Sequence, residues 1–170
     1  MYLNARSITN KIDELNVLVD EEKPDVIFIT ETWLSNSLPD VFLSLPNYEI
    51  FRANRGGGED PHGGVLMAVR SQLCPVLVSL SSDFEIVFVD IIAGGRRCRL
   101  GAIYRPPSCT LQQNEEILEF ISSKVSIVDE YCLFGDFNYG DIDWESFSCT
   151  MPQSRMFIDF TKEMNLTQNV

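Results

Sequence analysis

Residues Asp25 to Leu34 read DVIFITETWL, and this stretch decides the fold class. Its first six residues form an apolar, β-branched run without polar alternation, which is typical of a strand that is buried on both faces. Pro24 stands directly before the run and ends the helical pattern that precedes it. A strand buried on both faces needs covering layers, so the stretch favours a layered α/β protein. Glu31 then lies at the carboxyl end of this strand.

Outward from this strand, helical and extended patterns alternate. Towards the amino terminus, residues 1–3 resemble the end of a strand, and apolar residues at helical spacing predict a helix from about Thr9. Towards the carboxyl terminus, we predict strands at Tyr48–Arg52, Gly64–Arg70, Val76–Leu80, Phe84–Ile92, Arg99–Tyr104 and Tyr131–Phe134, and helices at Leu111–Val128 and Gln153–Met164. This order suits sheets that are covered by helices.

The composition limits the class of protein. With 170 residues and 45% hydrophobic content, the chain has the size of one globular domain, and we predict a single domain over residues 1–170. The formal charge of -12 opposes attraction to nucleic acid or to an anionic membrane. Residues 52–105 nevertheless carry seven Arg against five acidic residues. Within them, Arg96, Arg97 and Arg99 fit either a phosphate-facing surface or the solvated side of a hairpin.

The cysteines and the hydropathy pattern point to an intracellular protein. Five cysteines are odd in number and widely spaced, without a CxxC pair or a histidine at zinc spacing, so we expect reduced thiols. No apolar run approaches the length that spans a membrane, and the first residues lack the pattern of a secretion signal. We therefore expect no membrane partner. The oligomeric state is not indicated by any pattern.

Polar side chains follow three of the apolar strands. They are Asn4, Glu31, and the pair Asp136 and Asn138. Strand ends in α/β sheets are where ligand clefts form, and hard oxygen ligands of this kind suit magnesium better than zinc. Each residue taken singly also fits an ordinary structural role, such as a turn cap, a solvated strand end or a loop stabilised by side-chain bonds.

The sequence segments around these residues resemble successive motifs of the endonuclease/exonuclease/phosphatase superfamily. The motifs are Leu3-Asn4-Ala5-Arg6-Ser7, Thr30-Glu31-Thr32-Trp33-Leu34, Tyr104-Arg105-Pro106-Pro107 and Gly135-Asp136-Phe137-Asn138. The segments Phe51-Arg52-Ala53-Asn54-Arg55 and Gly63-Gly64-Val65 are most similar to the endonuclease of non-LTR retrotransposons. The resemblance implies a DNase I-like fold, a four-layer α/β/β/α sandwich.

The resemblance also implies a function, namely metal-dependent hydrolysis of phosphodiesters by a nuclear DNA endonuclease. Mg²⁺ or Mn²⁺ would be the cofactor and DNA the partner, and a reverse transcriptase, absent from these residues, would normally share the polyprotein. Glu31 would hold the metal with support from Asn4, and Tyr104 would hydrogen-bond the scissile phosphate. Asp136 would orient the attacking water with help from Asn138. The best candidates for contacts with backbone phosphates are Arg52, Arg55 and Arg105.

One part of the family pattern is missing, the later Asp and the terminal Ser-Asp-His motif. The sole histidine, His62, lies in a Gly-rich stretch that we interpret as a hairpin connection at the surface, since it lacks the Gly-Lys-Ser/Thr ending of a phosphate-binding loop. We therefore expect a domain that is incomplete at its carboxyl end and at its first strand, and an inactive chain. Two alternatives stay open: another phosphodiesterase or phosphatase of the superfamily, and a non-catalytic remnant or binding module.

Overall fold

The computed structural model describes residues 1–43, 45–55, 62–81 and 83–168. They form two compact units, which are described one at a time. The first comprises Met1–Arg105 and Glu130–Asp136, and the second comprises Pro106–Asp129 and Phe137–Val170. The predicted organisation as one domain stays a prediction. The core of the Gly-rich connection, residues 56–61, lies outside the described residues.

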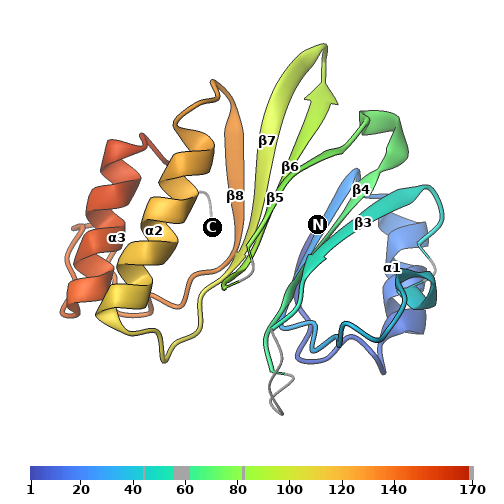
Figure 1. The fold of residues 1–170 in the computed structure, drawn as a ribbon, viewed down its shortest axis with the longest axis horizontal. Coiled ribbons are helices and arrows are strands. Elements are labelled where there is room, and N and C mark those ends of the chain that lie inside the picture. The colour runs from blue at the N-terminus through green and yellow to red at the C-terminus, as the bar shows by residue number, and fades with distance from the viewer. Residues whose placement is uncertain (44, 56–61, 82, 169–170) are drawn as a thin grey trace. The chain divides into compact units, whose positions relative to one another are not determined.

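The first unit contains a four-stranded sheet built around the DVIFIT stretch (Figure 1). Its strands, in spatial order, are β1 (Tyr2–Asn4), β2 (Val26–Thr30), β4 (Val65–Arg70) and β3 (Tyr48–Ala53). Strand β1 runs parallel to β2, whereas the β2–β4 and β3–β4 pairs are antiparallel. In β2, Ile27 and Ile29 are completely buried and Phe28 is nearly so, as the apolar run predicted.

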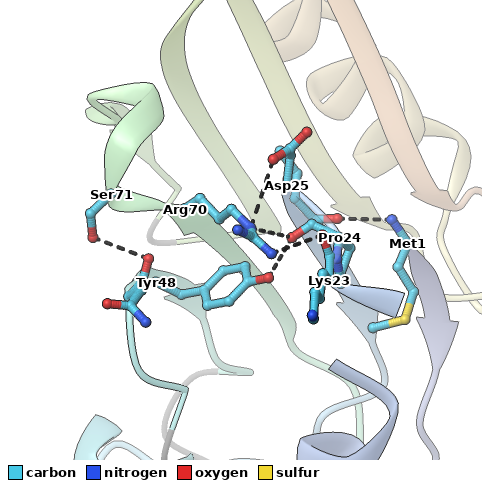
Figure 2. A network of polar contacts seen from close by, with 9 residues as sticks. Met1, Lys23, Pro24, Asp25, Tyr48, Arg70 and Ser71 are labelled. Carbon is cyan, nitrogen blue, oxygen red and sulfur yellow. Dashed lines mark hydrogen bonds and ion pairs between the residues drawn. The ribbon is translucent and has the colours of Figure 1, made fainter. Parts of the chain in front are cut away.

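Helix α1 (Ile12–Glu22) covers one face of this sheet. Its buried residues Leu15 and Val19 pack into one cluster with Ile27, Ile29 and Leu66. Figure 2 shows how the end of α1 is fixed: the Tyr48 hydroxyl donates to the Pro24 carbonyl, and Arg70 donates to the carbonyls of Lys23 and Pro24. These donors satisfy the carbonyl of Lys23, the C-cap of α1, and that of Pro24, the residue after it.

A second four-stranded sheet packs against the other face of the first. Its order is β5 (Val76–Leu80), β6 (Glu85–Ala93), β7 (Arg96–Tyr104) and β8 (Tyr131–Asp136). Strands β7 and β8 are parallel, and the other pairs are antiparallel. The apolar layer between the sheets includes Phe28, Met67, Val87, Val89 and Leu100.

Arg96 and Arg97 lie on the solvated side of the β6–β7 hairpin, which is one of the two predicted interpretations, with side chains 77% and 57% exposed. Arg99 fits neither interpretation. Arg99 is 3% exposed, and its guanidinium donates to both carboxylate oxygens of Asp90 at 2.7 and 3.0 Å. Arg97 also pairs with Asp90, at 3.0 Å, and Arg96 pairs with Glu130 at 2.9 Å. Two carboxylates, Asp90 and Glu130, thus pair with all three arginines and leave the cluster a single net positive charge.

The second unit contains α2 (Leu111–Val125) and α3 (Pro152–Glu163). Thr110 and Gln113 form a capping box at the start of α2. The two helices contact each other, and the buried Asn114 of α2 accepts a 2.7 Å hydrogen bond from the Tyr139 hydroxyl. The Tyr139 ring stacks on Phe157 of α3 at 4.3 Å between centroids. This contact ties the segment that follows β8 to both helices.

Most predicted elements are present with small changes at their ends. The strand at Val76–Leu80 has the predicted bounds, whereas the helix predicted to end at Val128 ends at Val125 and the first helix begins at Ile12 rather than near Thr9. Two short 3-10 helices, Asp40–Leu43 and Ser71–Leu73, were not predicted. Within the described ranges, no helix is long and apolar enough to cross a membrane.

Candidate active site

Three of the predicted site residues meet at one edge of the first unit. Asn4 ends β1, Glu31 directly follows β2, and Asp136 ends β8. The Asn4 side-chain amide donates to Glu31 Oε1 at 2.9 Å and to Asp136 Oδ2 at 3.2 Å. One amide thus bridges two carboxylates that are more than a hundred positions apart in the sequence.

The backbone around Glu31 is held in an unusual conformation. Glu31 and Trp33 have φ angles of 51° and 54°, a left-handed region that residues other than glycine seldom adopt. Hydrogen bonds fix this segment from both sides, since the Glu31 carbonyl accepts from the Ser7 amide at 2.9 Å and the Trp33 amide donates to the Gly63 carbonyl at 2.9 Å. Strained backbone that its neighbours hold in this way is frequent at functional sites.

Asp136 depends on the glycine that precedes it. A Cβ atom at Gly135 would lie 1.7 Å from the carbonyl oxygen of Ile103, so a side chain cannot be placed there without moving the β7 backbone. The parallel pairing of β8 with β7 brings Asp136 opposite Tyr104, and the Asp136 carbonyl accepts from the Arg105 amide at 2.9 Å.

Tyr104 lies beside these carboxylates and is 8% exposed. Burial raises the pKa of its phenol, and the negative charge of Glu31 raises it further, with smaller contributions from Glu85 and Asp136. Arg55 opposes this shift in the pKa of Tyr104. The phenol therefore keeps its proton at neutral pH and is available as a hydrogen-bond donor.

The three predicted phosphate-contacting arginines have different surroundings. Arg55 pairs with Glu85 at 2.6 Å, and its guanidinium lies 5.9 Å from the centre of the Tyr104 ring. Arg105 follows Tyr104 and is 4% exposed. The Arg52 guanidinium pairs with Asp40 at 2.7 Å and donates to the carbonyls of Ser35 and Leu38. Contacts of all three arginines with phosphate stay predictions.

Two further residues complete the set that the sequence singled out. Asn138 belongs to the second unit, so its predicted role beside Asp136 stays a prediction. His62 is exposed, and its ring meets the Trp33 ring edge to face at 4.3 Å. Sequence reasoning missed Glu85, because a single Glu at the start of a strand gives no sign of burial.

The donor set at this edge suits a hard divalent cation. Among the described residues, no three His, Cys, Asp or Glu side chains gather closely enough to hold a metal. The edge instead offers two carboxylates and one amide, as expected for Mg²⁺, which usually binds one or two carboxylates and keeps several waters. Zinc would prefer imidazoles or thiolates, so the residues fit magnesium or manganese better.

The amino-acid sequence matches the profile of the Endonuclease/Exonuclease/phosphatase family over residues 1–161. The chain belongs to this family. Among individual proteins, the chain is similar to the RNA-directed DNA polymerase from mobile element jockey of Drosophila melanogaster, with 24% identity over 143 residues. The aligned part covers 83% of the present chain and 15% of the jockey protein.

Solved structures show the same fold. The endonuclease domain of TRAS1, a telomere-specific non-LTR retrotransposon, has a TM-score of 0.67 at 15% identity, covering 95% of this chain and 68% of that domain's chain. The 3′ phosphatase NExo from Neisseria, bound to a product DNA hairpin, has a TM-score of 0.68 at 16% identity. The match covers 96% of the present chain and 69% of the NExo chain. The predicted resemblance to retrotransposon endonucleases and the DNase I-like α/β class are thus confirmed.

Proposed function

We propose that this chain carries the catalytic centre of a metal-dependent DNA endonuclease derived from a non-LTR retrotransposon. The observation that supports this most strongly is the Asn4 amide, which bridges Glu31 and Asp136 at the ends of three strands. A cation between the two carboxylates would offset their mutual repulsion, and it would also neutralise the charge that develops on the phosphate oxygens during hydrolysis.

Each residue of the centre has a defined task in this proposal. A bound Mg²⁺ or Mn²⁺ would neutralise charge on the non-bridging phosphate oxygens. Glu31 holds the ion, and Asn4 fixes the Glu31 carboxylate through its 2.9 Å hydrogen bond. Asp136 accepts a proton from the attacking water and orients it, with Asn138 as a second contact. Tyr104, whose phenol stays protonated, donates to a phosphate oxygen.

DNA is the substrate that the family relations favour. The jockey protein is a DNA polymerase of a mobile element, and the similar Neisseria phosphatase binds a DNA hairpin. The net charge of -12 opposes DNA binding, so Arg55, Arg105 and Arg52 have to supply a local positive border. A polyprotein shared with a reverse transcriptase and work in the nucleus are part of this proposal.

We expect the 170 residues to cleave DNA poorly by themselves. Their single histidine is His62, which lies against Trp33, and family members use a His of a terminal motif at the phosphate. Positioned proton transfer contributes about a hundred- to ten-thousand-fold in rate, so its loss leaves little activity above background.

The test is nicking of supercoiled plasmid in the presence of MgCl₂. It compares the chain, a version extended with the carboxyl-terminal segment of a similar retrotransposon endonuclease, and the Asp136→Ala variant of each. Nicking by the extended protein that disappears with Asp136→Ala supports the proposed function. Inositol phosphates and sphingomyelin, offered in parallel, test the other phosphodiesterase activities. If the protein hydrolyses those substrates and leaves the plasmid uncut, the assignment to DNA is contradicted.

A further inference from the structure

Glu85 is a buried carboxylate to which the proposed mechanism gives no task. It begins β6, is 6% exposed and stands directly opposite Tyr104 in the antiparallel pairing of β6 with β7. A buried carboxylate is costly unless a positive partner and hydrogen bonds compensate it. The identity of its partner therefore indicates why the charge is retained at this position.

The partner is Arg55, which follows β3 at the start of the β3–β4 connection. The Arg55 Nε donates to Glu85 Oε1 at 2.6 Å, and the side chain of Arg55 is 28% exposed against 7% for that of Glu85. The same guanidinium lies 5.9 Å from the centre of the Tyr104 ring. Arg55 thus contacts both Glu85 and Tyr104, and it keeps a partly open side towards solvent.

The returning end of the connection leaves room for this pair. A Cβ atom at Gly63 would lie 2.6 Å from the Glu85 carboxylate and 2.9 Å from the Arg55 guanidinium, and the φ angle of Gly63 is +121°. Glycine is therefore required at position 63. The Gly63 carbonyl also accepts from the Trp33 amide, which places the ion pair next to the segment that follows Glu31.

The charges of this group act on a common neighbour. Glu31, Glu85 and Asp136 each raise the pKa of the Tyr104 phenol, after the larger effect of burial, and Arg55 lowers that pKa. The guanidinium of Arg55 is therefore within electrostatic reach of the same phenol as the two carboxylates that Asn4 bridges. A fixed positive charge at this distance suits the binding of a phosphate oxygen, for which a planar guanidinium is well shaped.

We propose that Glu85 is a positioning residue, which fixes the Arg55 guanidinium beside Tyr104 so that it faces the phosphate to which the Tyr104 phenol donates. This inference rests on the proposed function, because it assigns the place where one DNA phosphate binds. A purely structural ion pair, which only ties the β3–β4 connection to β6, would affect the stability of the fold and leave the contact with DNA unchanged.

The experiment measures the salt dependence of DNA binding without metal, so that cleavage plays no part. A fluorescent B-form duplex is titrated in EDTA at several KCl concentrations. Loss of one phosphate contact reduces the slope of log K against log salt by about 0.9. We expect this reduction for Arg55→Ala and for Glu85→Ala, and no further reduction for the double variant. Glu130→Ala removes the Arg96 partner at the other end of β7 and serves as the matched control.

Glu85→Gln covers the case in which Glu85→Ala does not fold, because it keeps the volume and one acceptor oxygen. It should lower the slope by part of the Arg55→Ala effect and add nothing to that variant. A wild-type slope in the folded Glu85 variants, an unchanged slope in Arg55→Ala, or an equal loss in Glu130→Ala would each overturn the inference. The proposed function is judged separately, by the magnesium-dependent nicking that Asp136→Ala should abolish.

Discussion

Asp136 reaches its position because the residue before it has no side chain. A Cβ atom at Gly135 would clash with the Ile103 carbonyl at 1.7 Å, and the contact atom is backbone. We expect Gly135→Ala to lower the free energy of unfolding by about 3 to 5 kcal/mol, since strain and overpacking act together. Urea denaturation measures the change. Gly140→Ala, where no atom lies within 4 Å, is the control, and an equal loss in both variants would contradict this account.

Glu31 should decide whether magnesium stabilises the protein. A ligand that binds the folded state at ten times its Kd adds about 1.4 kcal/mol, which raises the melting temperature by about 3 to 5 °C in a chain of this size. We expect this rise in the wild type and its loss in Glu31→Gln. Glu49→Gln, which removes an exposed carboxylate from β3, should respond as the wild type does. A rise of equal size in Glu31→Gln would argue against the metal site.

The start of helix α3 depends on a carboxylate outside the helix, that of Asp141. Asp141 accepts hydrogen bonds from the Ser154 hydroxyl and from the amides of Thr150 and Met151, both at 2.8 Å. The bond from Ser154, followed by that from Met151, holds the pKa of Asp141 well below its usual range. These bonds hold the N-cap residue Met151 and the residue before it, and they join the first turn of α3 to Asp141 through the Ser154 hydroxyl.

A depressed pKa gives this contact a defined pH dependence. The stability that it contributes is present above the unfolded pKa of about 3.9, and it is lost as the pH falls towards the lower folded pKa. The difference in melting temperature between the wild type and Asp141→Asn should therefore shrink as the pH falls from about 5 to about 2. Ser154→Ala, which removes the main cause of the shift, should weaken this trend. A difference that stays constant with pH would contradict the role of the carboxylate.

The elements themselves could be predicted largely from local patterns. The β-branched run of β2 and the Pro24 boundary are local properties, and the predicted bounds of Val76–Leu80 agree with β5. The division of the strands into two sheets came only from the family resemblance. Turns between strands of one sheet and connections between two sheets contain the same kinds of residue, so a sequence without relatives does not separate them.

Contacts between distant residues explain what sequence reasoning missed at the site. Asn4, Glu31 and Asp136 were singled out because each comes at the end of a recognisable strand, and the family resemblance gave them their roles. Glu85 was missed because its burial depends on Arg55, 30 positions earlier in the chain. Likewise, the pairing of Arg99 with Asp90 across the β6–β7 hairpin was not visible in a count of charges. Local patterns therefore predict where polar groups lie along strands, but they do not predict which charges pair.

For the whole molecule, one charge distribution has two opposite consequences. The chain as a whole has a formal charge of -12, whereas the positive charge of the arginines near the site is confined to a small region. If these arginines bind DNA phosphates as proposed, added salt screens that contact and weakens DNA binding. The repulsion among the excess acidic residues destabilises the folded state, and salt screens this repulsion as well. Added salt should therefore stabilise the fold. Exposed ion pairs such as Arg96 with Glu130 contribute only about 0 to 1 kcal/mol, so their screening has less effect than that of the net charge.

We therefore expect the melting temperature to rise by about 2 to 4 °C between about 0.01 M and about 0.1 M KCl, as the screening length falls from about 30 to about 10 Å. The double variant Glu21→Gln/Glu22→Gln, with a formal charge of -10, tests the cause. Both residues are exposed at the carboxyl end of α1, where the last turn holds no basic residue and the helix dipole disfavours negative charge. This variant should melt higher at low salt and gain less from added KCl. A melting temperature that falls with salt would mean that ion pairs outweigh the repulsion, and the net charge would then not limit the stability of this fold.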